Sequence, residues 1–354
     1  MNNKNSITRN SSIELCRIFA MFFIVMSHTY ELGMGAWNYW SKLEGATYIP
    51  EVASQTFIAC FFYFGVNIFL LISGYFLIRP TIQKFIKLYI AVAFYTLIGI
   101  VFHQYQVGEY NLWSIIIHTL IPFGIPSGGG YWFIECYMYL FLFAPILNKA
   151  LKNMSDRELF AATALLGVIN IYFGYFWQIP RIDGSGYCFV HFVFMYVLGH
   201  LIYKKQTNIN SICHIKYYAI IVYVICAVLL FCMFYLSSEI HQFIIRAHCY
   251  SNPIVIIGAI AFFIPFTLVS TNNRIINTIA TTVLGVYLLQ GNRYFIHAIY
   301  ETLQPYTNIN LLVTFFIGFG LFIIGIAVDY LLQFIYKPIS NVFIKIVTRY
   351  KKEK

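Results

Sequence analysis

The sequence predicts an all-α fold, a polytopic bundle of about ten transmembrane helices with both termini in the cytoplasm. Three observations predict it: the composition, the spacing of the apolar stretches and the distribution of basic residues. Apolar residues make up 60% of the 354 residues and charged residues only 10%, with a mean hydropathy of +0.72. Soluble domains have about 45–50% apolar and about 25% charged residues. Lipid must therefore cover much of this chain's surface.

Ten stretches are long and apolar enough to be interpreted as spans, since a helix needs roughly 17–25 residues to cross a bilayer. They lie near 13–31, 57–78, 86–103, 131–148, 159–177, 188–203, 216–236, 253–270, 276–296 and 310–336. The ninth is the weakest, because Gly285, Gln290 and Gly291 interrupt it. The stretch 112–122 is too short to span, and the sequence leaves open whether it is re-entrant or interfacial.

The basic residues orient the bundle by the positive-inside rule. With the N-terminus inside, Arg17 falls within the first span and four residues fall in outer segments, which leaves 18 of the 23 Lys and Arg residues on the cytoplasmic side. The four outer residues are Lys42, Arg181, Arg246 and Arg293. Orientation thus explains the net charge of +10, and the expected partner is the lipid bilayer and not nucleic acid.

The chain is expected to form one membrane-embedded domain over residues 1–354. A short cytoplasmic arm, 1–12, precedes the first span. The basic tail, 337–354, is more typical of an anchor at an anionic leaflet than of a nucleic-acid arm. No Cys-x-x-Cys pair and no His-x3-His spacing occurs, so the sequence predicts neither a metal site nor a disulfide framework.

The first span carries ionisable residues, which cost about 2.5–3.5 kcal/mol at the centre of a membrane helix and are therefore functional candidates. Glu14 and Arg17 are three residues apart and are expected to pair on one helix face. His28 follows Arg17 by eleven residues, so the two share a face roughly 16 Å apart along the axis. The alternative is that Arg17 extends to the headgroups and His28 bonds a neighbouring helix. The three residues together favour a function.

Three further segments carry distinctive patterns. They are FGVNIFLLISGYFLIRP, in which Ser73-Gly74-Tyr75 precedes Arg79, then YWFIECYMYLFLFAPILN, and finally GVYLLQGNRY. Together with the Arg-x10-His spacing from Arg17 to His28, they resemble the acyltransferase-3 family of bacterial membrane acyltransferases. The four segments come in the family's order and cover essentially the whole chain. One departure is Gln290, which stands where many relatives place His.

The resemblance implies an O-acyltransferase in the bacterial cytoplasmic membrane. Such enzymes move an acyl group, usually acetyl from acetyl-CoA, to a hydroxyl of a cell-surface or lipid-linked glycan, as in capsule or exopolysaccharide modification. Acetyl-CoA would be a substrate, so no permanently bound cofactor is expected.

A sugar hydroxyl needs a base to remove its proton, and a buried neutral His, with a pKa near 6.5, is suited to that task. His28 is the candidate base. Arg17 and Arg79 are expected to bind the phosphates of the donor, with Lys84 as a secondary candidate. Glu14 would orient Arg17 or make its burial tolerable.

Other polar and aromatic residues have two interpretations each. Glu135 would orient His28 or bind a sugar hydroxyl, or else it is solvated at the interface. Trp37 and Trp132 are candidates for stacking on a sugar, although interfacial anchoring is common for such residues. Gln290 would hydrogen-bond the substrate. Asn67 in the second span would line an acyl pathway or, more commonly, bond another helix.

Asp329 in the last span is expected to be a structural partner. A second class of function stays open from the sequence alone: a glycan transporter or export component, in which Glu14, Arg17 and His28 form an ion relay. Transporters often show paired repeats with broken helices, and no such repeat is evident here. This favours the enzyme.

Overall fold

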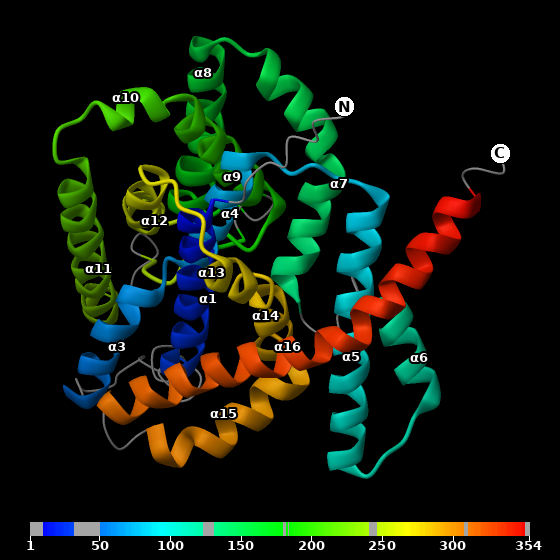
Figure 1. Ribbon diagram of the computed structural model, residues 1–354. Helices are drawn as coiled ribbons and strands as arrows, with labels where there is room; N and C mark the ends of the chain where they lie inside the picture. The colour runs from blue at the N-terminus through cyan, green and yellow to red at the C-terminus, as the bar shows by residue number, and fades with distance from the viewer. Residues whose placement is uncertain are drawn as a thin grey trace. The chain divides into compact units, whose positions relative to one another are not determined.

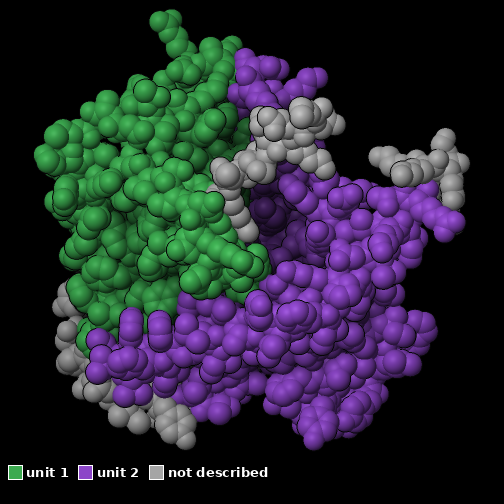
Figure 2. All heavy atoms as spheres, viewed as in Figure 1, with its two compact units in different colours: residues 1–27, 43–77, 154–283 green, residues 28–42, 78–153, 284–354 purple. Residues whose placement is uncertain are grey.

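A computed structural model describes residues 10–31, 50–122, 131–179, 182, 184–240, 246–307 and 311–350. Within these ranges every regular element is a helix, which confirms the all-α prediction (Figure 1). The chain divides into two compact units, coloured separately in Figure 2. Both are assembled from segments that are far apart in the sequence.

Unit 1 comprises residues 1–27, 43–77 and 154–283. Helix α1 (Ser11–Glu31) belongs to unit 1 up to Ser27, and its last turn belongs to unit 2. The other helices of unit 1 are α3 (Pro50–Phe62), α4 (Gly65–Phe76), α8 (Asp156–Gly167), η1 (Val168–Phe176), α9 (Phe189–Lys204), α10 (Gln206–Asn210), α11 (Ile215–Ile240), α12 (Pro253–Thr267) and α13 (Arg274–Ile279).

Unit 2 comprises residues 28–42, 78–153 and 284–354. Besides the end of α1, its helices are α5 (Ile82–Val107), α6 (Leu112–Leu120), α7 (Trp132–Asn153), α14 (Val283–Gln290, from Leu284 on), α15 (Arg293–Thr307) and α16 (Leu311–Tyr350). Within this unit α5 packs against α6, α15 and α16.

Seven helical stretches in the described residues are long and apolar enough to cross a membrane, so the chain is a multi-pass membrane protein. They are Ser11–Glu31, Ala53–Phe76, Ile82–Val107, Trp132–Asn153, Asp156–Phe176, Ile215–Phe234 and Leu311–Arg349. Each overlaps an expected span, and the last continues past residue 336 into the segment expected to be the tail. The sixth and eighth expected spans are the shorter apolar helices Phe189–Lys204 and Pro253–Thr267. The count of ten and the orientation stay predictions.

The ninth expected span, 276–296, is not one helix but parts of three, α13, α14 and α15. The break between α14 and α15 has a local cause. Asn292 lies just before α15 and accepts a hydrogen bond from the Tyr294 backbone N–H at 3.0 Å, so it caps the new helix. The short stretch near 112–122 forms the nine-residue helix α6.

The fifth expected span changes its winding within the span. It starts as the α-helix α8 and continues as the π-helix η1. In a π-helix the backbone hydrogen bonds join residues five apart, one more than in an α-helix. Arg246 closes the end of η1: its Nη2 donates to the carbonyl oxygens of Tyr175 at 2.6 Å and Gly174 at 3.2 Å. Its guanidinium also lies 5.3 Å from the centre of the Tyr175 ring, a cation–π distance.

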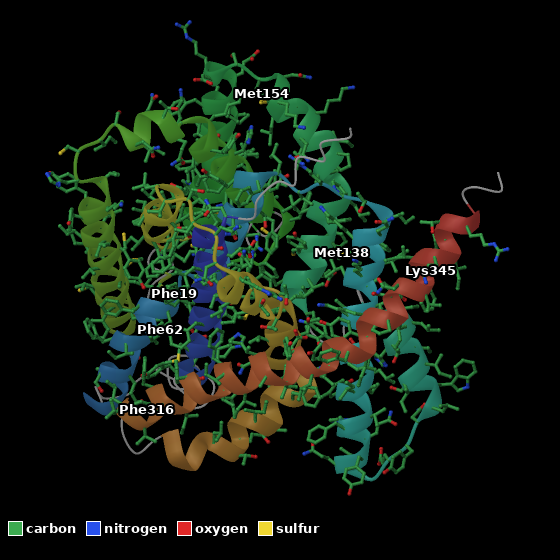
Figure 3. The ribbon with its side chains drawn as sticks, viewed as in Figure 1. Phe19, Phe62, Met138, Met154, Phe316 and Lys345 are labelled. Carbon is green, nitrogen blue, oxygen red and sulfur yellow. The ribbon has the colours of Figure 1, made fainter. Side chains whose placement is uncertain are left out.

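In unit 1, α4 and α9 cross with their backbones almost in contact. A Cβ atom added at Gly74 would lie 1.9 Å from the Tyr196 carbonyl oxygen, and one added at Gly199 would lie 2.3 Å from the Leu71 carbonyl oxygen. Small residues let membrane helices approach this closely, because lipid supplies no hydrophobic force between them. Elsewhere in the unit, rings fill the contacts: Phe23 of α1 lies 5.5 Å from Phe62 of α3, the residue labelled in Figure 3.

In unit 2 a buried carboxylate of α16 lies against α14. Asp329 of α16 is fully buried and accepts hydrogen bonds from Tyr95 Oη at 2.8 Å, Tyr336 Oη at 3.1 Å and Gln333 Nε2 at 2.5 Å. A Cβ atom at Gly285 of α14 would lie 1.7 Å from the Asp329 carboxylate. The structure thus gives Asp329 the partners that a structural carboxylate in a membrane helix requires.

Candidate functional site

Glu14 and Arg17 form the ion pair that their spacing predicts. Arg17 Nη1 donates to Glu14 Oε2 at 2.8 Å, with 28% of the Arg17 side chain and 9% of the Glu14 side chain exposed. The helix start that carries them is anchored within unit 1. The Ser11 N–H donates to the Thr271 carbonyl at 2.8 Å, and Ser11 Oγ donates to Asn277 Oδ1 at 2.9 Å. Arg17 is therefore held on a fixed helix end and still has exposed surface with which to bind an anion.

His28 lies on the last turn of α1 and is half-buried. Its Nδ1 atom is buried, and no residue in the described ranges hydrogen-bonds it. The same turn is fixed within unit 2, because Tyr30 Oη donates to the Leu311 carbonyl at 3.2 Å. The imidazole thus sits on a well-positioned turn, in a setting suited to proton transfer.

Gln290 is connected to this turn of α1. Tyr300 Oη donates to Gln290 Oε1 at 2.9 Å and lies 3.4 Å from Thr29 Oγ1, and Thr29 directly follows His28. All three side chains are buried. Burial raises the pKa of the Tyr300 phenol, so the hydroxyl keeps its proton and can act as a donor. The structure thus brings Gln290 into the surroundings of His28 through a residue that the sequence did not single out.

Glu135 and Trp132 lie in the first turn of α7. Glu135 Oε1 accepts a hydrogen bond from Tyr139, one turn further along the same helix, at 2.8 Å. The Trp132 ring contacts Phe133, with 5.9 Å between ring centres. The described contacts therefore give Glu135 a partner on its own helix, and its expected role beside His28 stays a prediction.

Arg79 and Lys84 form an exposed basic turn in unit 2. Lys84 Nζ donates to the Arg79 carbonyl at 2.9 Å, and its backbone N–H is capped by Thr81 Oγ1 at 3.2 Å. Asn148 of α7 holds the preceding residue, because its Nδ2 donates to the Ile78 carbonyl at 2.6 Å. The two basic residues thus lie around the start of α5, where the helix dipole adds to their field.

Trp37, a substrate-binding candidate, lies outside the described residues. Within the described part of the chain, no group of three or more His, Cys, Asp or Glu side chains is arranged to hold a metal ion.

The sequence missed Tyr300, Tyr131 and Asn292. Asn292 Nδ2 donates to the Tyr131 hydroxyl at 2.8 Å and to the Tyr95 carbonyl at 3.0 Å, and Tyr131 Oη donates to the Leu288 carbonyl at 2.7 Å. These bonds hold both ends of the break between α14 and α15. The signal in the sequence was weak: Asn292 belongs to the segment GVYLLQGNRY, but its partners lie more than a hundred residues away.

A family model described as "Acyltransferase domain" matches residues 10–330. The match covers well over half of the chain and includes Glu14, Arg17, His28 and Gln290. No curated protein and no solved structure matches the chain.

Proposed function

Because the chain belongs to the acyltransferase-3 family and is therefore an acyl-transferring membrane enzyme, we propose that it moves an acetyl group from acetyl-CoA to a hydroxyl of a cell-surface or lipid-linked glycan. The proposed setting is the bacterial cytoplasmic membrane. The whole chain would act as one membrane-embedded domain, with the basic residues of its tail at the cytoplasmic leaflet.

The donor phosphates require cations. Arg17 is ion-paired yet partly exposed, so it can still donate to a phosphate oxygen. Arg79 and Lys84 are two further exposed cations that could bind a phosphate. Glu14 keeps the Arg17 guanidinium directed along one face of α1, which supports its assignment as a positioning residue.

The acceptor hydroxyl requires a base. In the proposed reaction His28 takes the hydroxyl proton while the oxygen attacks the thioester carbonyl. The carbon–sulfur bond then breaks, and the CoA sulfur leaves as a thiol after receiving the proton from His28. No metal is needed for this exchange, because one imidazole takes the proton from the hydroxyl and returns it to the leaving sulfur.

The acceptor would be held by groups around His28. Gln290 is linked to the same turn of α1 and supports hydrogen bonding to a sugar or to the reacting carbonyl. Trp132 offers a ring at the start of α7, Glu135 a carboxylate one turn in, and Trp37 a further ring from the first loop.

One observation carries this proposal: the single unbroken helix α1 bears the Arg17–Glu14 ion pair near its start and His28 in its last turn, inside the matched range. A cation for phosphate and a base for a hydroxyl are the two groups that acetyl transfer from CoA requires. The family match favours this reading over the transporter alternative, in which the same residues would form an ion relay.

The proposal is tested by the O-acetyl content of surface glycan, measured by NMR in a gene-deletion strain that carries wild-type protein or His28→Ala. We expect wild type to restore acetylation and His28→Ala to restore less than about one hundredth of it, because general-base catalysis contributes about 100- to 10,000-fold.

His103→Ala is the matched control, since His103 is an exposed residue of α5 outside the matched motifs. Full acetylation by His28→Ala would exclude His28 as the base. If the deletion alters glycan export but never its acetylation, the transporter alternative is correct.

A further inference from the structure

The Tyr300 hydroxyl lies between two polar groups of different character. The Gln290 Oε1 atom, 2.9 Å away, is a carbonyl oxygen and can only accept a hydrogen bond. The Tyr300 hydroxyl has a single hydrogen, which this bond uses. Thr29 Oγ1 lies 3.4 Å from the same phenol oxygen. Tyr300 thus contacts the turn that follows His28 on one side and donates to Gln290 on the other.

The bond from Tyr300 fixes which end of the Gln290 amide faces the Tyr300 hydroxyl. An amide presents an acceptor at one end and two donors at the other, and rotation by about 180° would exchange them. The exposed fractions are 0% for Thr29, 3% for Tyr300 and 2% for Gln290, so water does not compete for these bonds. With Oε1 held by Tyr300, the Nε2 donors point the other way.

The amide is fixed to the turn that carries the proposed base. Thr29 follows His28 on the last turn of α1, and Gln290 is the last residue of α14. Resting on the proposed function, we infer that Tyr300 is a positioning residue for acyl transfer: it orients Gln290 so that Nε2 donates to the substrate, either to the acceptor or to the carbonyl oxygen that gains negative charge.

An amide at this position has a distinct chemical consequence. Gln290 donates hydrogen bonds at every working pH and, unlike a His side chain, neither takes up nor releases a proton. Substituting Gln290 or Tyr300 should therefore lower the rate of acyl transfer without moving its pH dependence.

The test is a double-mutant cycle between Tyr300→Phe and Gln290→Met. Each protein is produced in the deletion strain, and radiolabelled acetyl-CoA is added to inverted membrane vesicles, which contain the native glycan acceptor. We expect Gln290→Met to lower the transfer rate about 100-fold, as removal of a single oriented donor does in other enzymes. Tyr300→Phe should lower it about 10-fold, with the KM for acetyl-CoA unchanged.

The double variant should be no slower than Gln290→Met alone, because Tyr300 then has nothing left to orient. Tyr294→Phe, on the same helix and with its ring 4.7 Å from His103, is the control and should keep the wild-type rate. Losses that multiply in the double variant, or a Tyr300→Phe rate equal to wild type, would overturn the inference.

The two proposals fail in different ways. If the vesicles with wild-type protein transfer no acetyl to glycan, the proposed function is wrong. If wild type is active and His28→Ala transfers acetyl normally, His28 is not the base. If His28→Ala is inactive while Tyr300→Phe is normal, only the positioning role of Tyr300 is wrong. Vesicle protein levels and unfolding temperatures, measured for every variant, separate a loss of rate from a loss of folded protein.

Discussion

In each unit a glycine lets two helices pack closely, but the group that the glycine packs against differs. In unit 1, Gly74 of α4 lies against the backbone carbonyl of Tyr196 on α9. In unit 2, Gly285 of α14 lies against the side-chain carboxylate of Asp329 on α16. Each glycine makes room for an oxygen atom, but one oxygen belongs to the main chain and the other to a side chain.

The difference shows what holds helices together where lipid replaces water. Backbone contact gives close van der Waals packing and no polar group to satisfy, so it suits a rigid crossing. A buried carboxylate requires several donors, which Tyr95, Tyr336 and Gln333 supply. That network joins α5 and α16 beside the glycine of α14. The helix that ends at Gln290 packs through Gly285 against the carboxylate of this network.

The largest effect is expected from Gly74→Ala. The new methyl group would lie 1.9 Å from the Tyr196 carbonyl oxygen, so α4 and α9 would have to separate. We expect a loss of about 3 kcal/mol or more in the free energy of unfolding, seen as a lower unfolding temperature in detergent and a lower membrane level.

Gly320→Ala is the control for this change, because a Cβ atom there meets nothing within 4 Å. It should leave stability unchanged or raise it by about 0.5–1 kcal/mol, the usual gain of Ala over Gly in a helix. Equal unfolding temperatures for the two variants would show that the α4–α9 crossing is less tight than described.

A smaller effect, which a second substitution should partly offset, is expected from Gly285→Ala. The methyl group would displace the Asp329 carboxylate from its donors, at a cost of about 2–3 kcal/mol. Because the obstacle is a side chain, Asp329→Ala should offset part of the loss, and the two changes should couple by about 1–3 kcal/mol.

The same thermal-unfolding assay is applied to the wild type, the two single variants and the double variant. Strictly additive losses for Gly285→Ala and Asp329→Ala would contradict the contact between them. At Gly74 no substitution of Tyr196 offers such a rescue, because the obstacle there is a carbonyl oxygen of the main chain.

The smallest effect is expected from Asn67→Ala in unit 1. Asn67 Nδ2 donates to the Tyr250 carbonyl at 2.9 Å, and its Oδ1 accepts from His191 Nε2 at 2.8 Å. Hydrogen bonds between membrane helices contribute about 0.6 kcal/mol on average and at most about 1.7. We expect a loss of about 1 kcal/mol in stability with acyl transfer retained. A large loss of transfer at unchanged stability would instead support the acyl-pathway role of Asn67.

Much of the helical architecture follows from local sequence. Apolar runs locate seven of the expected spans, because the length of a span is set by the bilayer. The Glu14–Arg17 pair follows from i, i+3 spacing on one helix and is confirmed. Asp329 was expected to be structural, because a lone carboxylate in an apolar helix requires partners, and those partners are now identified.

The rest depends on contacts between distant residues, which hydropathy does not encode. The break of the ninth span relies on Asn292 and on its bonds to Tyr95 and Tyr131. Tyr300 stands 271 positions from Thr29, and nothing in the intervening sequence marks the pair. The change from α-helix to π-helix in the fifth span likewise leaves no pattern in the sequence, since an apolar stretch can form either helix.

The closure of η1 by Arg246 has a consequence for the order in which the protein is made. Tyr175 lies 71 positions before Arg246, and Pro180, five residues after Tyr175, has no N–H with which to bond its carbonyl. A ribosome therefore delivers the fifth span to the membrane before the guanidinium that bonds its last carbonyls. The hydrogen bonds from Arg246 to the end of η1 can form only after α11 has been synthesised.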